Sequence, residues 1–367
     1  MAGKSGDGHS ARSRIDRLRA SFSALRVDAL LVSHLPNVQY LCGFTGSAAL
    51  LLIEPQSSTL FTDSRYTFQA KEEVAEARVH IARRGLIRAL GAALRKRRGR
   101  TRVAFPPAQL SVDQKNALGQ QAGSRVRWVE SGNLVEKLRA IKDSGELAAM
   151  REAARLISEV FLGLGPKIQV GATELALAAE IDHAVKLKGA SGPSFETIVA
   201  SGERSAWAHA RPSSKPLRKN ELVVFDQGAI LRGYCSDMTR TVFLGRAPEN
   251  VRRMYQAVFE AQQAAKQAIR PGVTASAVDR AARLVLRDYG LDRSFTHSTG
   301  HGLGLEVHEM PRLGQREKTV LQGGMVLTVE PGVYLEGVGG IRIEDDVLVT
   351  PSGAEDLTTA PRELLEL

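Results

Sequence analysis

Short apolar runs separated by segments of helical spacing mark the first part of the chain. Apolar side chains recur at helical intervals between residues 15 and 25. The apolar runs have the length of buried strands and lie at residues 28–32, 48–53, 58–62 and 102–105. Strands that alternate with helices are typical of an α/β domain. We therefore predict such a domain over residues 11–131, preceded by a disordered tail at residues 1–10.

The pattern changes near residues 130–133, where long helical segments begin. Residues 134–164 have few helix breakers, and a second helix is expected over residues 173–187 with Thr173 as its N-cap. Strands follow, and then another pair of helices at residues 249–269 and 274–289. This repeated order suggests two related halves within a second domain, for which we predict the bounds 132–367.

Residues 222–243 predict a β-hairpin, because two runs rich in Val, Phe and Tyr meet around Leu231 and Arg232. If the turn is centred between these two residues, Asp226 and Asp237 face each other. Two carboxylates about 5 Å apart repel by about 3 kcal/mol at an effective dielectric constant of ~20. We expect a cation between them. A hairpin of different register, in which both carboxylates are solvated, is the alternative.

A second hairpin is expected between residues 325–330 and residues 341–349. Glu330 and Glu344 are equidistant from Gly337, so these two side chains can also face each other. The glycine-rich turn permits other registers. Carboxylates are rarely buried unless they are paired or bound to a metal ion.

Three of the eight histidines, His297, His301 and His308, fall within a twelve-residue segment that is also rich in glycine. A single histidine is usually a packed core residue, whereas a cluster among glycines indicates a site. The HExxH pattern of zinc peptidases is absent.

Two aspartates, two glutamates and one histidine carry four negative charges, enough to neutralise two divalent cations. Oxygen ligands with one imidazole favour Mn²⁺, although Co²⁺ and Zn²⁺ also fit. Two such ions lie roughly 3.5 to 4 Å apart and lower the pKa of a shared water, which favours hydrolysis.

Composition narrows the class of protein. The 367 residues are 43% hydrophobic and 25% charged, as in a globular protein of two domains. The two cysteines are too few for a disulfide framework, so a reducing cytoplasm is expected. No apolar run has the ~20 residues of a membrane helix, and the first residues lack the apolar core of a signal peptide.

The net charge of +10 raises the question of nucleic-acid binding. The densest basic stretch, from Arg95 to Arg102, has no interleaved aromatic residues and no recognised binding motif. We interpret it as a solvated face and expect no nucleic-acid partner. The charge can still attract acidic substrates.

The order of the five ligand candidates resembles the creatinase/aminopeptidase P/prolidase family, the pita-bread metallopeptidases. The matching segments of the second domain are DQGA at 226–229, SDMTRT at 236–241, GHGLGL at 300–305, VHE at 307–309, TVEPGVY at 328–334 and RIED at 342–345. In the first domain they are NVQYLCGFTGS at 37–47 and DSRY at 63–66, and RAIK at 139–142 resembles the linker helix. The resemblance implies an α+β fold, with a pita-bread catalytic domain after a smaller α/β creatinase-like domain.

The resemblance also implies roles for individual residues. Asp226 and His301 would each bind one metal ion, and Asp237 and Glu344 would bridge both. Glu330 would bind metal and handle the proton of the bridging water.

Other residues would line the substrate side or support the ligands. His308 and His209 would stabilise the tetrahedral intermediate, and His297 would lie beside them. Arg342 would hold the carboxylates in place. The proline carboxylate would be bound by Arg312, with Arg316 as the reserve; a simple surface role is the alternative for both arginines. Tyr234 is a further candidate for substrate contact.

Members of this family cleave the bond before proline, whose ring fixes φ and removes the N–H. The complete ligand set argues against creatinase, a metal-free relative, and the additional first domain argues against methionine aminopeptidase. We favour an Xaa-Pro dipeptidase (prolidase), because nearby arginines and a compact first domain can close the site behind a dipeptide. An aminopeptidase P acting on longer peptides is the alternative.

A non-catalytic pita-bread binding module is a more remote alternative, since such modules typically lack ligands that are all present here. The resemblance further suggests a homodimer in which the first domain walls the partner's site, with Arg65 or Tyr66 contributing.

Overall fold

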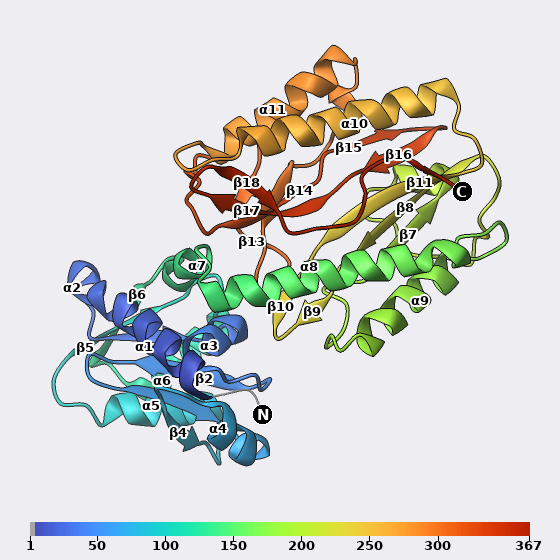
Figure 1. The fold of residues 1–367 in the computed structure, drawn as a ribbon. Coiled ribbons are helices and arrows are strands. Elements are labelled where there is room, and N and C mark those ends of the chain that lie inside the picture. Colours follow the sequence, from blue (N-terminus) through green and yellow to red (C-terminus); the bar gives the residue numbers. More distant parts are fainter. Residues whose placement is uncertain (1–3) are drawn as a thin grey trace. The chain divides into compact units, whose positions relative to one another are not determined.

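The computed structural model describes residues 4–367, which form two compact units that meet between Arg139 and Ala140 (Figure 1). Of the expected disordered tail, residues 1–3 lie outside the described residues, and residues 4–10 belong to the first helix. Among the residues described, no helix is long and apolar enough to cross a membrane.

The first unit is built on a six-stranded mixed sheet with the order β4-β3-β2-β1-β5-β6. Its strands are β1 (Ala29–Val32), β2 (Ala49–Ile53), β3 (Ser58–Thr62), β4 (Arg78–Ile81), β5 (Thr101–Phe105) and β6 (Val126–Glu130). Its helices are α1 (Lys4–Ala20), α2 (Phe22–Leu25), α3 (Leu35–Cys42), η1 (Ser64–Tyr66), α4 (Thr67–Glu73), α5 (Leu86–Arg95), α6 (Val112–Ala122) and α7 (Leu134–Arg139). The four predicted apolar runs correspond to β1, β2, β3 and β5, whose buried side chains pack against α5 and α6.

The helical pattern predicted over residues 134–164 is interrupted, so the prediction of one long helix was wrong. Helix α7 ends at Arg139, and α8 (Ser144–Leu164) begins with a capping box between Asp143 and Glu146. Arg139 and Glu136 both hydrogen-bond Asn37 of the first unit, over 2.7 Å each. The two units therefore divide eight residues after the expected position between residues 131 and 132.

The second unit consists of strands enclosed by two helix pairs. Its helices are α8, η2 (Gly165–Lys167), α9 (Glu174–Leu187), η3 (Gly202–Ala206), α10 (Glu249–Ala268), α11 (Ala275–Asp288) and η4 (Asp292–Ser294). Figure 1 shows α8 and α9 on one side of the strands and α10 and α11 on the other. Thr173 is the N-cap of α9, as predicted, and its hydroxyl accepts from the N–H of Ala176. The helices around 249–269 and 274–289 are also confirmed.

The strands form two main sheets and two hairpins. One sheet has the order β19-β11-β8-β7 and the other β13-β12-β14-β17-β18, while β9 pairs with β10 and β15 with β16. The strands are β7 (Ile198–Ser201), β8 (Glu221–Gln227), β9 (Ile230–Leu231), β10 (Tyr234–Cys235), β11 (Met238–Leu244), β12 (Gly300–Gly302), β13 (Glu309–Leu313), β14 (Val326–Val329), β15 (Gly332–Leu335), β16 (Gly339–Arg342), β17 (Asp345–Thr350), β18 (Gly353–Asp356) and β19 (Leu365–Glu366).

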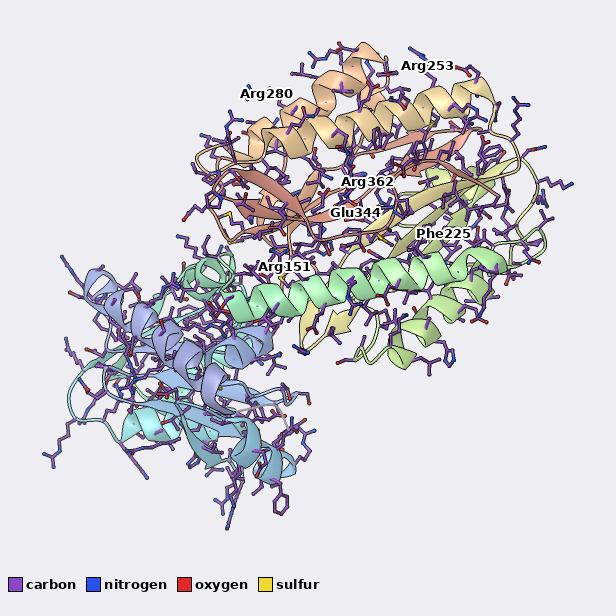
Figure 2. The ribbon with its side chains drawn as sticks, in the orientation of Figure 1. Arg151, Phe225, Arg253, Arg280, Glu344 and Arg362 are labelled. Carbon is purple, nitrogen blue, oxygen red and sulfur yellow. The ribbon has the colours of Figure 1, made fainter. Side chains whose placement is uncertain are left out.

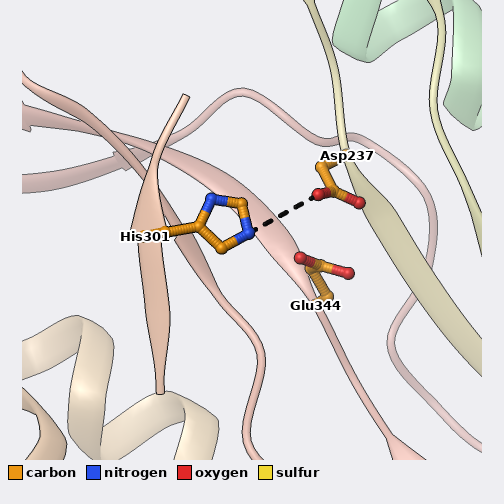
Figure 3. A group of neighbouring side chains, drawn as sticks. All are labelled: Asp237, His301 and Glu344. Carbon is orange, nitrogen blue, oxygen red and sulfur yellow. Dashed lines mark ion pairs between the residues drawn. The ribbon is translucent and has the colours of Figure 1, made fainter. Parts of the chain in front are cut away.

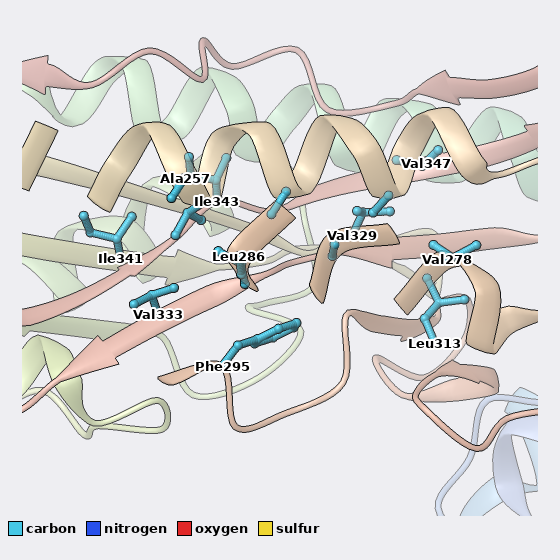
Figure 4. Close-up of a cluster of buried hydrophobic side chains, with 14 of the residues drawn as sticks. Ala257, Val278, Leu286, Phe295, Leu313, Val329, Val333, Ile341, Ile343 and Val347 are labelled. Carbon is cyan, nitrogen blue, oxygen red and sulfur yellow. The ribbon is translucent and has the colours of Figure 1, made fainter. Parts of the chain in front are cut away.

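Each helix pair covers a separate apolar core. Helices α10 and α11 pack on Val329, Ile341 and Ile343 from the strands (Figure 4). Helices α8 and α9 pack on the other side of the strands, around Phe225 of β8. Figure 2 places Phe225 and Glu344 among the strands, whereas Arg253 and Arg280 project from the outer sides of α10 and α11. Residues between these two cores are therefore enclosed by packed elements.

The last residues of the chain are bound to the strands. Strand β19 extends the first sheet by pairing in parallel with β11. Arg240 of β11 donates to the carbonyl oxygens of Pro361 and Ala360 over 2.6 and 2.7 Å, and to Asp345 over 2.9 Å. Asp345 is fully buried and also accepts from Lys266 and Arg362. This buried ion cluster ties residues 360–362 to the strand that follows Glu344.

Candidate metal centre

The hairpin of residues 222–243 forms, but its register differs from the prediction. Asp226 pairs with Thr239, and the tip pairs Leu231 with Tyr234. The turn is thus centred between Arg232 and Gly233, both of which have positive φ (52° and 84°), as in the two-residue hairpin turns that favour glycine. Asp226 and Asp237 are not directly opposite. Since Asp237 is two residues from Thr239, both carboxylates still belong to the same face.

The second hairpin has the predicted register. Val329 pairs with Asp345, and Gly332 pairs with Arg342. Both pairs are equidistant from Gly337, so the residues between them, Glu330 and Glu344, are opposite each other. Glu344 is buried and accepts a 2.6 Å hydrogen bond from Thr239 of the first hairpin. That bond joins the two carboxylate hairpins.

His301 brings an imidazole to these carboxylates. It lies in β12, where its backbone N–H donates to Thr328 Oγ1 over 3.2 Å. Its Nε2 is 3.4 Å from Glu330 Oε1 and 3.8 Å from Asp237 Oδ2. Figure 3 shows the ring directed at Asp237 and Glu344. One potential ligand atom from each of Asp237, His301 and Glu344 lies within 4.8 Å of the others.

The electrostatics of this cluster call for a cation. Burial, followed by repulsion from Glu344 and Asp226, raises the pKa of Asp237 well above its usual value. Burial raises the pKa of Glu330 to about 7, against the lowering effect of Arg342. The Oδ1 atoms of Asp226 and Asp237 are buried without a hydrogen-bond partner. Clustered carboxylates with unpaired oxygens and one imidazole fit a divalent metal ion.

Arg342 organises one side of the cluster. Its Nη2 donates to Asp226 Oδ2 over 2.6 Å, and its Nε donates to Thr239 Oγ1 over 3.0 Å. Its Nη1 reaches the hydroxyl of Tyr334 over 2.8 Å and the carbonyl oxygen of Ala208 over 3.1 Å. The guanidinium is buried, so these contacts fix the orientation of Asp226 and, through Thr239, of Glu344.

Tyr334 joins this network and was not among the predicted site residues. Its hydroxyl lies 2.9 Å from His297 Nε2, while His297 Nδ1 lies 2.8 Å from the carbonyl oxygen of Ser298. A Cβ on Gly332 would be 2.6 Å from that hydroxyl, so a larger residue there would push the Tyr334 ring from its position. The glycine two residues before Tyr334, on the same face of β15, is the signal that could have identified it.

Three other predicted site residues are His308, His209 and Arg312. The ring of His308 is 4.4 Å from that of His301. His209 is exposed on the loop after η3. Burial, followed by the nearby Arg342 guanidinium, lowers the pKa of His297 to about 4, and burial also lowers the pKa of His308. Arg312 is exposed and pairs with His301 across β12 and β13.

The last two predicted residues belong to the segments at the ends of strands β13 and β9. Arg316 is exposed in the turn after β13. Tyr234 lies at the tip of the β9–β10 hairpin, and its hydroxyl donates to Glu146 of α8 over 3.0 Å.

Comparison with known proteins agrees with this geometry. Residues 148–351 match the model of metallopeptidase family M24, and residues 14–141 match the model of the creatinase/prolidase N-terminal domain. An Xaa-Pro dipeptidase of Pyrococcus horikoshii is 35% identical over 340 residues, which are 92% of this chain and 95% of the relative.

Solved structures are similar over nearly the whole chain. The Xaa-Pro dipeptidase from Bacillus anthracis has a TM-score of 0.93 at 35% identity and covers 97% of this chain and 100% of its own. The X-Pro aminopeptidase from Thermotoga maritima has a TM-score of 0.86 at 36% identity, with coverages of 95% and 100%. The expected pita-bread architecture with a creatinase-like first domain is thereby confirmed.

Proposed function

The chain belongs to metallopeptidase family M24, and we propose that it is an Xaa-Pro dipeptidase that uses two divalent metal ions. The observation that carries this proposal is the convergence of Asp237, His301 and Glu344, with Glu330 beside His301. The similarity to dipeptidases of Pyrococcus and Bacillus supports the substrate class.

The metal ions would be held by Asp226, Asp237, His301, Glu330 and Glu344. Most of these ligands are hard oxygen donors, which favours Mn²⁺, with Co²⁺ or Zn²⁺ as other choices. When bound, such ions lower the pKa of water and polarise the scissile carbonyl.

The side chains around the ligands supply the remaining chemistry. The Glu330 carboxylate takes up the proton of the attacking water and passes it to the leaving proline nitrogen. His308 and His209 donate hydrogen bonds to the oxygen on which negative charge develops. His297 is oriented beside them by its contact with Tyr334.

Recognition of the dipeptide requires a cation for the proline carboxylate. Arg312 is our candidate, because it is exposed and pairs with His301 in adjacent strands. Arg316 is the reserve. The Tyr234 contact with Glu146 gives no support for substrate binding by that residue.

An aminopeptidase that accepts longer peptides is the second candidate, favoured by the comparable similarity to the Thermotoga enzyme. The decisive experiment treats the protein with EDTA, restores Mn²⁺, and follows hydrolysis of Ala-Pro and Ala-Pro-Ala. We expect metal-dependent cleavage of Ala-Pro alone. Cleavage of the tripeptide at a comparable rate would indicate the aminopeptidase, and no metal-dependent cleavage of either would contradict both candidates.

We further propose a cytoplasmic homodimer. Cys42 and Cys235 are both buried, and two cysteines are too few for a disulfide framework, which suits a reducing compartment. Sedimentation of the purified protein tests the dimer, and a monomer at working concentration would contradict it.

A further inference from the structure

Glu174 is a fully buried carboxylate that takes no part in the metal centre. It occupies the first turn of α9 and accepts hydrogen bonds from two separate segments of the chain. The backbone N–H and the hydroxyl of Ser201 each donate to Oε1 over 2.8 Å. The N–H and the hydroxyl of Ser213 donate to Oε2 over 3.1 and 2.7 Å.

These two serines bracket residues 202–212, which carry His209. Ser201 is the last residue of β7, and the segment after it begins with η3. Arg204, inside the segment, also donates from Nε to Glu174 Oε2 over 3.0 Å and from Nη2 to the carbonyl oxygen of Arg211 over 2.5 Å. One carboxylate thus binds both ends of the loop and one residue within it.

The middle of the loop is attached to the metal centre. Ser205 Oγ accepts from the N–H of Gly340 over 2.8 Å, and the carbonyl oxygen of Ala208 accepts from Arg342 over 3.1 Å. His209 follows Ala208 directly. The position of the imidazole therefore depends on the anchors at the loop ends and on Arg342.

The number of donors explains how a charged group is tolerated at this depth. A buried carboxylate is costly unless most of its lone pairs accept hydrogen bonds, and Glu174 accepts from Ser201, Arg204 and Ser213. Although burial opposes ionisation, these hydrogen bonds hold the pKa of Glu174 below its usual value. Loss of the charge would leave several donors without an ionic acceptor.

We propose that Glu174 is a positioning residue that holds the 202–212 loop so that His209 faces the substrate, a role that rests on the proposed function of His209. Substitution of Glu174 then acts on the reaction through the loop and leaves the metal ligands in place.

Trp207 gives a readout of the loop that does not depend on activity. It lies two residues before His209, is 59% exposed, and stacks on the Arg204 guanidinium at 4.8 Å. The chain has only one other tryptophan, Trp128 in β6. In a Trp128→Phe background, acrylamide quenching and anisotropy of the emission report Trp207 alone.

Glu174→Gln should make Trp207 more easily quenched and lower its anisotropy in the metal-free protein. Glu180→Gln is the matched control, because Glu180 lies on the same helix and pairs with Lys167 on the surface. Ser213→Ala, which removes a single hydroxyl donor, should give the same change to a smaller extent if Glu174→Gln unfolds. Unchanged quenching and anisotropy of Trp207 in both Glu174→Gln and Ser213→Ala would overturn the proposal.

Kinetics then test the link to His209. Glu174→Gln should lower kcat/KM on the order of 10- to 100-fold, as small misplacements of catalytic groups do, with bound metal unchanged. Combined with His209→Ala, it should add little to the loss caused by His209→Ala alone, because the two act as one unit. Additive losses would overturn the proposal. Full activity of His209→Ala would instead refute the proposed role of His209, while the quenching result would still decide whether Glu174 orders the loop.

Discussion

Arg342 Nη2 lies 2.6 Å from Asp226 Oδ2, and both side chains are buried. The same guanidinium contacts Thr239, Tyr334 and the Ala208 carbonyl oxygen, so it holds both the Asp226 carboxylate and the 202–212 loop in place. Lysine preserves the charge but cannot reproduce this planar fork.

We therefore predict that Arg342→Lys lowers metal affinity about 10- to 100-fold, as expected when a residue that orients a metal ligand is changed. Calorimetric titration of the metal-free protein with Mn²⁺ measures the affinity. Arg253→Lys on the outer side of α10 is the control and should bind as the wild type does. Equal affinity of the Arg342 variant would show that Asp226 does not depend on this contact.

Asp237→Asn should abolish metal binding and activity while leaving the metal-free fold intact. Burial and four neighbouring carboxylates disfavour ionisation of Asp237, so a neutral amide relieves repulsion in the empty site. Atomic absorption measures the bound metal, and circular dichroism of the metal-free variant checks the fold. Retention of two ions by the variant would remove this residue from the ligand set.

Metal binding should raise the melting temperature of the EDTA-treated protein. A ligand at 100 times its Kd stabilises the folded protein by ~2.7 kcal/mol. Each kcal/mol corresponds to roughly 2–4 °C in melting temperature for a unit of the size of residues 140–367. Calorimetry with added Mn²⁺ measures the shift, and Asp237→Asn should show none. An identical shift in that variant would indicate binding elsewhere.

The carboxylate of Asp345 accepts from Arg240, Lys266, Arg362 and Gln262 in the interior. Removal of one member of a buried charge cluster leaves the others uncompensated, at a cost of roughly 3–5 kcal/mol. Asp345→Asn should lower the free energy of unfolding in urea by that amount. Asp356→Asn, at an exposed site beside Lys266 and Arg362, is the milder comparison.

Burial raises the pKa of the Cys42 thiol to about 11, so little thiolate forms in the folded protein near pH 8. Because only the thiolate reacts, alkylation by iodoacetamide should be roughly 100-fold or more slower than in urea. Because the folded-state pKa is raised, the Cys42 thiol contributes to the free energy of unfolding in full below the unfolded-state pKa of ~8.5. That contribution is lost as the pH rises towards 11. Peptide mapping distinguishes Cys42 from Cys235, and rapid labelling of folded protein at pH 8 would contradict the shift.

The sequence was sufficient for the face of each hairpin but not for every register. Glu330 and Glu344 are opposite each other as predicted, because the glycine-rich turn leaves the strands symmetric about Gly337. The first hairpin turns one residue later than predicted, because Arg232 adopts a positive φ that is unusual for a residue other than glycine. That shift moves the register by two residues and preserves the face.

Contacts between distant polar residues could not be read from periodicity. Tyr334 meets His297, and Glu174 meets Ser201 and Ser213, across separations of 27 to 39 residues in the chain. Tyr234 was a candidate for substrate contact because it lies beside the hairpin turn, and its contact with Glu146 of α8 could not be foreseen from that position. Local patterns define which residues share an element, but only the packing of elements defines which polar groups meet.

The pairing of β19 with β11 has a consequence for synthesis. Units generally fold as they emerge from the ribosome, amino-terminal first, so the first unit can fold while the second is still being translated. The sheet that carries Asp226 gains its edge strand only when residues 365–366 leave the exit tunnel. A nascent chain stalled before that point would expose the edge of β11, and such chains are the ones we expect to need a chaperone.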